Sequence, residues 1–286
     1  NGMSESLTLY SYWRSSAAYR VRIGLNLKGL AYTTVPVHLV QDGGQQHAAA
    51  YQQINPQELV PALKHGQRQL TQSLAILEYL DEVWPTPPLL PATARERHRV
   101  RALAQLVACD IHPLNNLRVM QYFENTWSVP QAERDEWIKH WIVEGFQAME
   151  TLLANDPATG AFCHGQTPGL ADCCLVPQVF NARRFNCALD AYPTILRIGA
   201  VAVMNNPLYS DRELEHQFCD SRSKVLITLD LLGNRMIDLR PRTSIKQIVI
   251  TSIGDYLPFP KNLLFPLVGK KKKLAADVKA ADDLFK

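Results

Sequence analysis

Short apolar runs and helical spacing alternate along the first part of the chain, beginning with the stretch LTLYSYWRSSAAYRVRIGLNLKGL that starts at Leu7. Its first residues form an apolar run typical of a strand that is covered on both faces. Ser15 and Ser16 follow, and serine is a favoured residue at the start of a helix. Apolar residues then recur at every fourth position as far as Leu25, and Gly29 supplies a left-handed stop. The stretch therefore predicts a strand, a loop with two adjacent hydroxyl groups and a helix.

The same two periodicities continue to about position 84. Two short runs flank a tight turn at His65-Gly66, which predicts a β-hairpin. Pro36 lies in the β-rich segment before it, so this segment fits the edge of a sheet better than its centre. Ser73 is expected to cap the last helix of this part. The elements expected after the first helix are a strand, a short helix, two hairpin strands and a helix, over 32–39, 46–52, 62–64, 69–71 and 73–84.

From Thr93 to Ile195 the apolar pattern is helical throughout and carries no strand signal. Pro113 is expected to kink or interrupt the first of these helices. A second helix is expected over 131–153, and a third opens after Gly169. The proline-rich segment 85–91 precedes them all and is typical of a domain boundary.

The pattern changes again near Gly199. An acidic helix is followed there by β-branched runs that predict strands over 224–229 and 245–252. The chain is therefore expected to have three parts, an α/β part, an all-helical part and a second, partial α/β part.

Composition is that of a globular protein, because 47% of the 286 residues are hydrophobic and 20% are charged. A formal net charge of +3 does not indicate a nucleic-acid partner. The six cysteines show neither a CxxC spacing nor a disulfide framework, and adjacent Cys173 and Cys174 are expected to pack as small hydrophobic residues. There is no secretory segment and no apolar run long enough to span a membrane, so we expect a soluble cytoplasmic protein.

The two adjacent hydroxyl groups are the first candidates for chemistry. A hydroxyl at the first turn of a helix lies among unpaired backbone N–H groups and at the positive end of the helix dipole. Such a place favours an anion, including a thiolate. On this segment alone, a capped helix with no further role is favoured by about two to one.

Five motifs taken in order resemble the zeta-class glutathione transferases, the family of maleylacetoacetate and maleylpyruvate isomerases. They are SYWRSSAAYRVRI, NPQELVPAL, LTQSLAILEYLDE, CDIHPLNNLRV and ADCCLVPQVFNARRF, and the resemblance covers roughly 6–197. It implies the glutathione transferase fold, with a thioredoxin-like glutathione-binding domain over 6–84, a linker over 85–91 and an all-α domain over 92–198. It also implies glutathione as the cofactor, no metal and a homodimer.

The resemblance assigns roles by position. Ser15, with Ser16 beside it, would be catalytic and would donate a hydrogen bond to the glutathione sulfur. Val60 would pair through its backbone with the peptide part of glutathione, because thioredoxin-like domains hold a cis proline at the next position. Gln72 and Ser73 would bind the γ-glutamyl carboxylate, and Gln46 would contact the glycyl end. The full set implied for glutathione is Ser15, Ser16, Ala17, Arg20, Gln46, Val60, Gln72, Ser73, His112, Asn116, Leu117 and Arg118.

The implied reaction is the conversion of maleylacetoacetate to fumarylacetoacetate in aromatic amino acid catabolism. Thiolate adds to the cis double bond of an enedione diacid, the former double bond rotates, and thiolate leaves to give the trans product. Arg14, Arg20, Arg118 and Arg184 are candidates to hold the carboxylates, and Arg14 and Arg184 are preferred. Arginine suits this role because its guanidinium binds a carboxylate through two parallel hydrogen bonds.

Each assignment also has a plainer interpretation. His112 can be a helix-end histidine, Arg184 part of a solvated face and Ser73 only a cap. Three positions depart from the family pattern. Gly169 stands where the family normally has a Ser or Thr that caps the helix before Asp172, which costs about a few tenths of a kcal/mol. Ala17 stands where the family commonly has Cys, which is expected to alter kinetics without abolishing activity. Gly24 stands where the family usually has Ala, a change that costs about 1 kcal/mol in a helix interior.

The final part, 199–286, resembles an internal fragment of a long-chain acyl-CoA ligase, and the chain is interpreted as a fusion. No ATP chemistry is expected from this part, since it has no glycine-rich phosphate loop ending in lysine. Alternatives for the whole chain are a maleylpyruvate isomerase, a general glutathione transferase or dehalogenase, and a non-catalytic glutathione-binding fusion protein.

Overall fold

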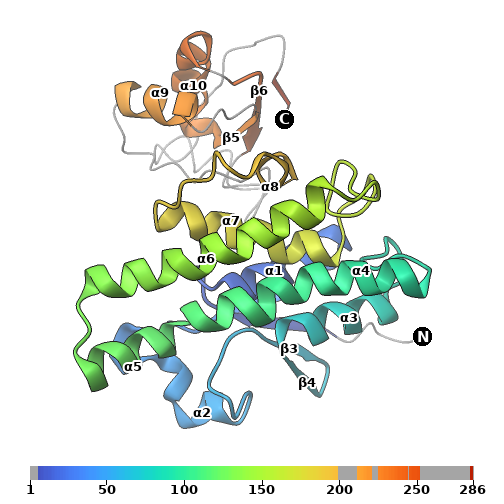
Figure 1. The fold of residues 1–286 in the computed structure, drawn as a ribbon, viewed down its shortest axis with the longest axis vertical. Coiled ribbons are helices and arrows are strands. Elements are labelled where there is room, and N and C mark those ends of the chain that lie inside the picture. The colour runs from blue at the N-terminus through green and yellow to red at the C-terminus, as the bar shows by residue number, and fades with distance from the viewer. Residues whose placement is uncertain (1–5, 199–210, 221–224, 244, 252–283, 286) are drawn as a thin grey trace, which may run out of the picture. The chain divides into compact units, whose positions relative to one another are not determined.

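The computed structural model describes residues 6–198, 211–220, 225–243, 245–251 and 284–285 (Figure 1). Contacts within the chain divide it into two compact units, Asn1–Val201 and Ala202–Lys286. Each unit is described by itself. No helix in the described ranges is both long and apolar enough to cross a membrane.

The first unit opens with a mixed sheet. Its strands are β1 (Leu7–Ser11), β2 (Thr33–Pro36), β3 (Ala62–His65) and β4 (Arg68–Thr71), in the spatial order β2-β1-β3-β4. β1 and β2 run parallel, with Thr8 opposite Thr33, whereas β3 is antiparallel to both β1 and β4. The expected hairpin is confirmed, with Gly66 at φ +57° in its turn. The edge position expected for Pro36 is confirmed as well, because β2 pairs only with β1 in this sheet.

Helices α1 (Ser16–Leu27) and α3 (Ser73–Val83) pack against each other and against the sheet. Their inward faces share a core with the central strands, formed by Leu7, Leu9, Val21, Leu25, Leu63, Ile76 and Leu80. The short helix expected over 46–52 forms only as α2 (Ala49–Gln52). Two short 3-10 turns, Gln41–Gly43 and Gln45–His47, precede it, since positive φ angles at the two glycines of this loop interrupt a continuous helix.

One prediction for α3 is wrong by a residue. Gln72, with φ +67°, is the N-cap, and Ser73 is the first helical residue. The Ser73 hydroxyl therefore does not cap the helix, and it accepts a hydrogen bond from the Arg20 guanidinium instead.

Lys28 fastens the segment that follows α3. Its buried ammonium donates to Asp81 Oδ1 at 2.8 Å and to the backbone oxygens of Trp84 and Pro87. The Asp81 carboxylate also accepts from the backbone amides of Leu89 and Leu90. The proline-rich segment is thus attached to the C-terminal end of α1 and to α3.

The remainder of the first unit is helical, as expected. It comprises α4 (Ala94–Gln105), a π-helical turn (Leu106–Ile111), a 3-10 turn (His112–Asn115), α5 (Leu117–Trp127), α6 (Gln131–Ala154), α7 (Leu170–Arg184) and α8 (Pro193–Ile198). The interruption expected at Pro113 is confirmed, and the α-helix already gives way to the π-helical turn at Leu106. α7 packs on α1 and α4, which brings its last turn next to the α/β part.

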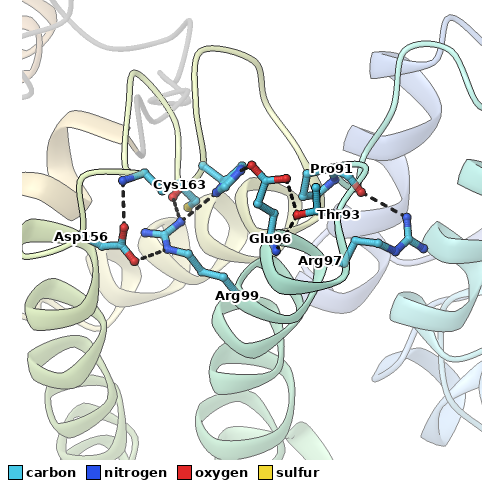
Figure 2. A network of polar contacts seen from close by, with 9 residues as sticks. Pro91, Thr93, Glu96, Arg97, Arg99, Asp156 and Cys163 are labelled. Atoms are coloured by element: carbon cyan, nitrogen blue, oxygen red, sulfur yellow. Dashed lines mark hydrogen bonds and ion pairs between the residues drawn. The ribbon is translucent and has the colours of Figure 1, made fainter.

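The loop between α6 and α7 is attached to α4 through one arginine. Arg99 donates from Nε to Asp156 at 2.7 Å and from Nη1 to the Cys163 carbonyl at 2.7 Å (Figure 2). The buried Asp172 carboxylate accepts from the amides of Cys163 and Gly169, which closes the start of α7. Cys173 and Cys174 are fully buried in the helical core, as expected for small hydrophobic residues.

The second unit contains α9 (Asp211–Asp220), β5 (Val225–Leu229), α10 (Asp230–Leu239), β6 (Gln247–Thr251) and β7 (Leu284–Phe285). Its strands pair in parallel in the order β5-β6-β7. The acidic helix and the two strands predicted from the sequence therefore form. They share a core made by Leu214, Phe218, Leu226, Met236, Leu239, Ile245, Ile248 and Ile250.

Candidate functional site

The hydroxyl of Ser15 lies at the N-terminus of α1. Ser15 is the N-cap, with φ −72° and ψ 115°, and its Oγ accepts a hydrogen bond from the Ala18 amide at 3.1 Å. Because Oγ is the acceptor in this bond, its own hydrogen remains available to donate. Ser16 and Ala17 follow in the first helical turn, where backbone N–H groups have no intrahelical partner. The arrangement suits an anion beside Ser15.

A buried cation lies one turn further along α1. Arg20 is 3% exposed, and its Nη1 donates to Ser73 Oγ at 3.1 Å. Its Nε and Nη2 have no hydrogen-bond partner among the described residues. Burial lowers the pKa of Arg20, although a guanidinium remains charged at neutral pH. The buried guanidinium therefore keeps two unused N–H groups next to the start of α3. An anionic ligand at this position would accept hydrogen bonds from them and compensate the charge.

His112 lies close to the same cation. Burial, with a further contribution from the Arg20 charge, lowers the pKa of His112 to about 3. The imidazole is therefore neutral at physiological pH. The structure thus brings together Arg20, Ser73 and His112, which come from three separate segments of the chain.

The loop before β3 carries Val60, and the Val60–Pro61 bond is cis. Its backbone is held from inside by Tyr51 Oη and Asn55 Nδ2, which both donate to the Leu59 carbonyl. Gln72 reaches the same loop, because its Nε2 donates to Gln57 Oε1 at 2.8 Å. The start of α3 and the cis-proline loop are therefore next to each other.

Gln46 lies in a 3-10 turn on a different loop. It is 5% exposed and donates to the Leu39 carbonyl, and its Oε1 has no partner among the described residues. The segment before this loop contacts the residues that precede the helix, because the rings of His38 and Tyr12 lie 5.0 Å apart and Val37 and Leu39 pack in one cluster with Tyr12.

Arg184, in the last turn of α7, lies within electrostatic reach of Arg14. Partial burial lowers the pKa of Arg184, and the nearby charge of Arg14 lowers it further. Arg14 directly precedes Ser15, so this pair of cations lies next to the helix start. Neither makes an ion pair in the described part of the chain, and two unpaired cations of this kind suit a ligand with carboxylates.

The remaining predicted residues lie at the start of α5. Asn116 is the N-cap of this helix, and its Oδ1 accepts from the Arg118 amide at 3.2 Å. Leu117 and Arg118 are exposed. Among the described residues, no hydrogen bond or ion pair joins these three to Ser15 or Arg20, although their helix contacts the turn that carries His112.

One residue that holds the site was missed by the sequence reasoning. Arg22 donates to Ser11 Oγ and to the backbone oxygens of Tyr12 and Trp13, which fixes the loop that leads to Ser15. A signal existed in the motif RVR. Residues two apart on a helix point in directions roughly 200° apart, so Arg20 and Arg22 cannot share one role.

In the described ranges, no group of three or more His, Cys, Asp or Glu side chains is placed to hold a metal ion. A hollow of about 370 Å³ lies on α4 and contains none of the predicted site residues; it is lined by Ala94, Arg97, His98, Arg101, Ala102 and Gln105.

Comparison with known proteins agrees with this geometry. Residues 9–88 match the family model of the glutathione S-transferase N-terminal domain. The chain is 51% identical over 195 residues to a probable maleylacetoacetate isomerase of Vibrio cholerae, covering 68% of this chain and 90% of the relative. It is 50% identical over 195 residues to the maleylpyruvate isomerase of Ralstonia sp., covering 68% and 91%.

Solved structures give the same result. A holo maleylpyruvate isomerase, described as a bacterial zeta-class glutathione transferase, has 50% identity and a TM-score of 0.66, over 68% of this chain and 90% of that one. The maleylacetoacetate isomerase of Methylobacterium extorquens AM1, solved with bound malonate and glutathione, has 44% identity and a TM-score of 0.65, over 67% and 89%. This chain therefore belongs, over about 195 residues, to the family of zeta-class glutathione transferases and maleylacetoacetate isomerases.

Proposed function

We propose that this protein is a glutathione-dependent isomerase that converts maleylacetoacetate to fumarylacetoacetate in aromatic amino acid catabolism. One observation carries the proposal. An N-cap hydroxyl, at Ser15, directly follows Arg14, and the charge of Arg14 acts on Arg184, which comes from the other end of the first unit. A thiolate and a diacid need these groups next to each other. The relatives named as isomerases of such diacids support the same activity.

Ser15 and Ser16 would be the catalytic pair. A free thiol with a pKa near 8.5 is mostly protonated at neutral pH. The Ser15 hydroxyl would donate to the sulfur, and the N-terminus of α1 would add its positive potential. Each unit by which the pKa falls is worth about 1.4 kcal/mol in favour of the thiolate.

The remainder of glutathione would be bound by the start of α3, by the loop before β3 and by the 3-10 turn that carries Gln46. Ser73, supported by Arg20, would bind the γ-glutamyl carboxylate together with Gln72. The backbone of Val60 would pair with the peptide part, and Gln46 would contact the glycyl end. The unused donors of Arg20 support an anion near this position. On the resemblance we assign the other contacts to Ala17, His112, Asn116, Leu117 and Arg118.

Glutathione supplies a thiolate that adds reversibly to the cis double bond, so that the former double bond can rotate. Arg14 and Arg184 would hold the two carboxylate ends and orient the diacid. Their charges would also stabilise negative charge that develops on the conjugated oxygen. Neutral His112 can donate or accept a hydrogen bond without adding a further charge.

A maleylpyruvate isomerase is the second candidate, because the Ralstonia relative of that name is as similar as the maleylacetoacetate isomerases. The two substrates differ in the tail of the diacid. Mixing glutathione and the protein with each diacid, and following the enedione absorbance, would separate them. Turnover with electrophilic halides alone would favour a general transferase or dehalogenase, and glutathione binding without any turnover would favour a non-catalytic protein.

We further propose a cytoplasmic homodimer. The five described cysteines are free, which supports a reducing compartment. The dimer rests on the family resemblance, and the mass of the protein in solution would test it. The same resemblance divides the first unit into domains over 6–84 and 92–198.

The likeness of 199–286 to a fragment of an acyl-CoA ligase also stays a proposal. Parallel β5 and β6 with α10 between them support an α/β segment. We expect no ATP-dependent thioester formation from it.

Substitutions at Ser15 test the proposed activity. Ser15→Ala removes both the donor and the cap, whereas Ser15→Gly removes the donor but lowers the capping energy by only about a few tenths of a kcal/mol. We expect kcat/KM to fall about 10²-fold in both, as for loss of one preorganised donor. Only the alanine variant should also lose about 1 kcal/mol of unfolding free energy. Unchanged kcat/KM in Ser15→Gly would rule out the proposed role of the hydroxyl.

A further inference from the structure

Trp13 is an exposed tryptophan in the loop between β1 and α1. Its relative exposure is 58%, although large aromatic side chains are highly buried on average. It directly precedes Arg14, the first of the two arginines assigned to the carboxylates of the diacid. We therefore asked what the exposed indole contacts at this position.

The loop that carries Trp13 is held by hydrogen bonds from Arg22 of α1. Arg22 donates from Nη2 to the Trp13 carbonyl at 3.3 Å and from Nη1 to Ser11 Oγ at 3.0 Å. The ring of Tyr12, which is 8% exposed, lies 6.0 Å from the Trp13 ring between centroids. The indole therefore lies next to a buried ring and is attached to an anchored backbone, and these contacts leave most of its surface uncovered.

The open face of the indole is covered by Arg14. Its Cζ lies 4.4 Å from the centroid of the Trp13 ring, well within the range of a cation–π contact. Tryptophan is the aromatic side chain that attracts a cation most strongly. In the described part of the chain, Arg14 makes no ion pair.

A like charge acts against this position of Arg14. The Arg14 charge acts against the charge of Arg184 and outweighs the weaker, opposite effect of Asp135, and neither arginine makes an ion pair with a described carboxylate. A flexible arginine side chain in this situation would turn away into solvent. The indole supplies an attraction that opposes the repulsion before any diacid arrives.

We propose that Trp13 is a positioning residue that holds the Arg14 guanidinium opposite Arg184, so that both are ready for the two carboxylates of the substrate. The inference rests on the proposed function, since it concerns the same diacid site. It adds a specificity determinant that contacts the substrate only through Arg14. Preorganisation of this kind strengthens binding because less side-chain freedom is lost when the ligand arrives.

The test measures binding of a simple dicarboxylate as well as turnover. Malonate is the probe, and its Kd is measured by calorimetry on the full chain saturated with glutathione. Trp13→Leu removes the aromatic face, Trp13→Phe keeps a weaker one, and Arg14→Met removes its partner. Trp127→Leu is the matched control, because Trp127 is 61% exposed and lies on α5, where it stacks on Phe123.

We expect Trp13→Leu to raise the malonate Kd and the KM for the diacid about two- to fivefold, the size of an exposed cation–π contact. Trp13→Phe should give a smaller rise, and the Kd for glutathione should not change in either variant. In the Arg14→Met background, Trp13→Leu should have no further effect on the malonate Kd. Trp127→Leu should behave as the unmodified protein does.

Three results would overturn the inference. These are an unchanged malonate Kd in Trp13→Leu, an equal rise when Arg14 is already absent, or the same rise in Trp127→Leu. Absence of turnover in the unmodified protein would instead count against the proposed isomerase. The malonate measurements would still decide the role of Trp13 in that case.

Discussion

Arg20 is a buried side chain that would serve the proposed site without touching the reacting atoms. It places a full charge inside the protein with a single hydrogen bond, to Ser73, and with two donors unused. An uncompensated buried charge lowers stability. In this position, however, it leaves the Ser73 hydroxyl hydrogen free to point at a ligand, and it adds positive potential at the start of α3.

Replacement of Arg20 should therefore separate stability from binding. We expect Arg20→Met to keep the unfolding free energy within about 1 kcal/mol, because the loss of a hydrogen bond is offset by removal of the buried charge. The Kd for glutathione should rise about fivefold, since a charge-assisted contact behind the carboxylate is lost. Urea unfolding and calorimetric titration check the two parts. A parallel loss of stability and affinity in Arg20→Met, with both retained in Arg20→Lys, would point to a purely structural role.

His112 should make stability depend on pH. Its pKa is lowered to about 3 in the folded protein, mainly by burial, whereas the unfolded chain has the ordinary value near 6.5. Between these values the unfolded state binds more protons, so stability is complete above about pH 6.5 and falls as the pH drops toward 3.

We expect the unfolding free energy to be about 1–2 kcal/mol lower at pH 5 than at pH 7 because of this residue. Urea unfolding at both pH values measures it. The difference should shrink in His112→Asn. The same difference in both proteins would assign the effect to other groups.

At the scale of elements, two glycines let helices approach closely. A Cβ built on Gly24 of α1 would lie 2.1 Å from Leu77 Cδ2, at the end of a side chain that can rotate. A Cβ on Gly145 of α6 would lie 2.3 Å from Ile111 Cδ1 and 2.4 Å from its Cγ1. Isoleucine is branched at Cβ and has little rotamer freedom, so the second contact cannot be relieved as easily.

The two alanine variants should therefore differ. Gly145→Ala is expected to lower the unfolding free energy by about 1–3 kcal/mol, as overpacking does. Gly24→Ala should change it by less than about 1 kcal/mol, because the gain in helix propensity offsets the shift of Leu77. Denaturant unfolding of both variants measures this order. A larger loss in Gly24→Ala would show that Leu77 is the more rigid neighbour.

Local patterns in the sequence were sufficient for most elements. The serine at the start of α1, the hairpin glycine at position 66 and the interruption near Pro113 all act within a few residues, and each was predicted. Contacts between distant residues were not. Neither the Arg20–Ser73 bond nor the attachment of Lys28 to Asp81 follows from spacing along the chain, because both depend on how the helices pack. The shift of the α3 cap from Ser73 to Gln72 has the same origin.

At the scale of the whole molecule, the first unit has a core that crosses the proline-rich segment. Leu77 of α3 belongs to the same buried cluster as Leu89, Leu90 and Phe146. The core of the helical part therefore extends into the α/β part through α3, which also contributes Ile76 and Leu80 to the core of the sheet. The second unit has a separate cluster of its own.

We expect a chain that ends after Val201 to unfold in one transition, at the midpoint that the first unit shows in the full chain. Its Kd for glutathione should be unchanged, because the residues assigned to glutathione all precede this position. Calorimetric melting and titration of both proteins provide the test. Two separate transitions in the shortened chain would show that the two parts unfold independently, and a shifted Kd would show that the second unit contributes to binding.

The attachment of Lys28 has a consequence for how the protein would work. One ammonium and one carboxylate, at Asp81, secure the proline-rich segment at four backbone groups. A segment held in this way cannot serve as a hinge, so the gap between Ser15 and Arg184 is set when the chain folds. Substrate capture should then proceed without domain closure, at a rate limited by diffusion and release rather than by a slow rearrangement.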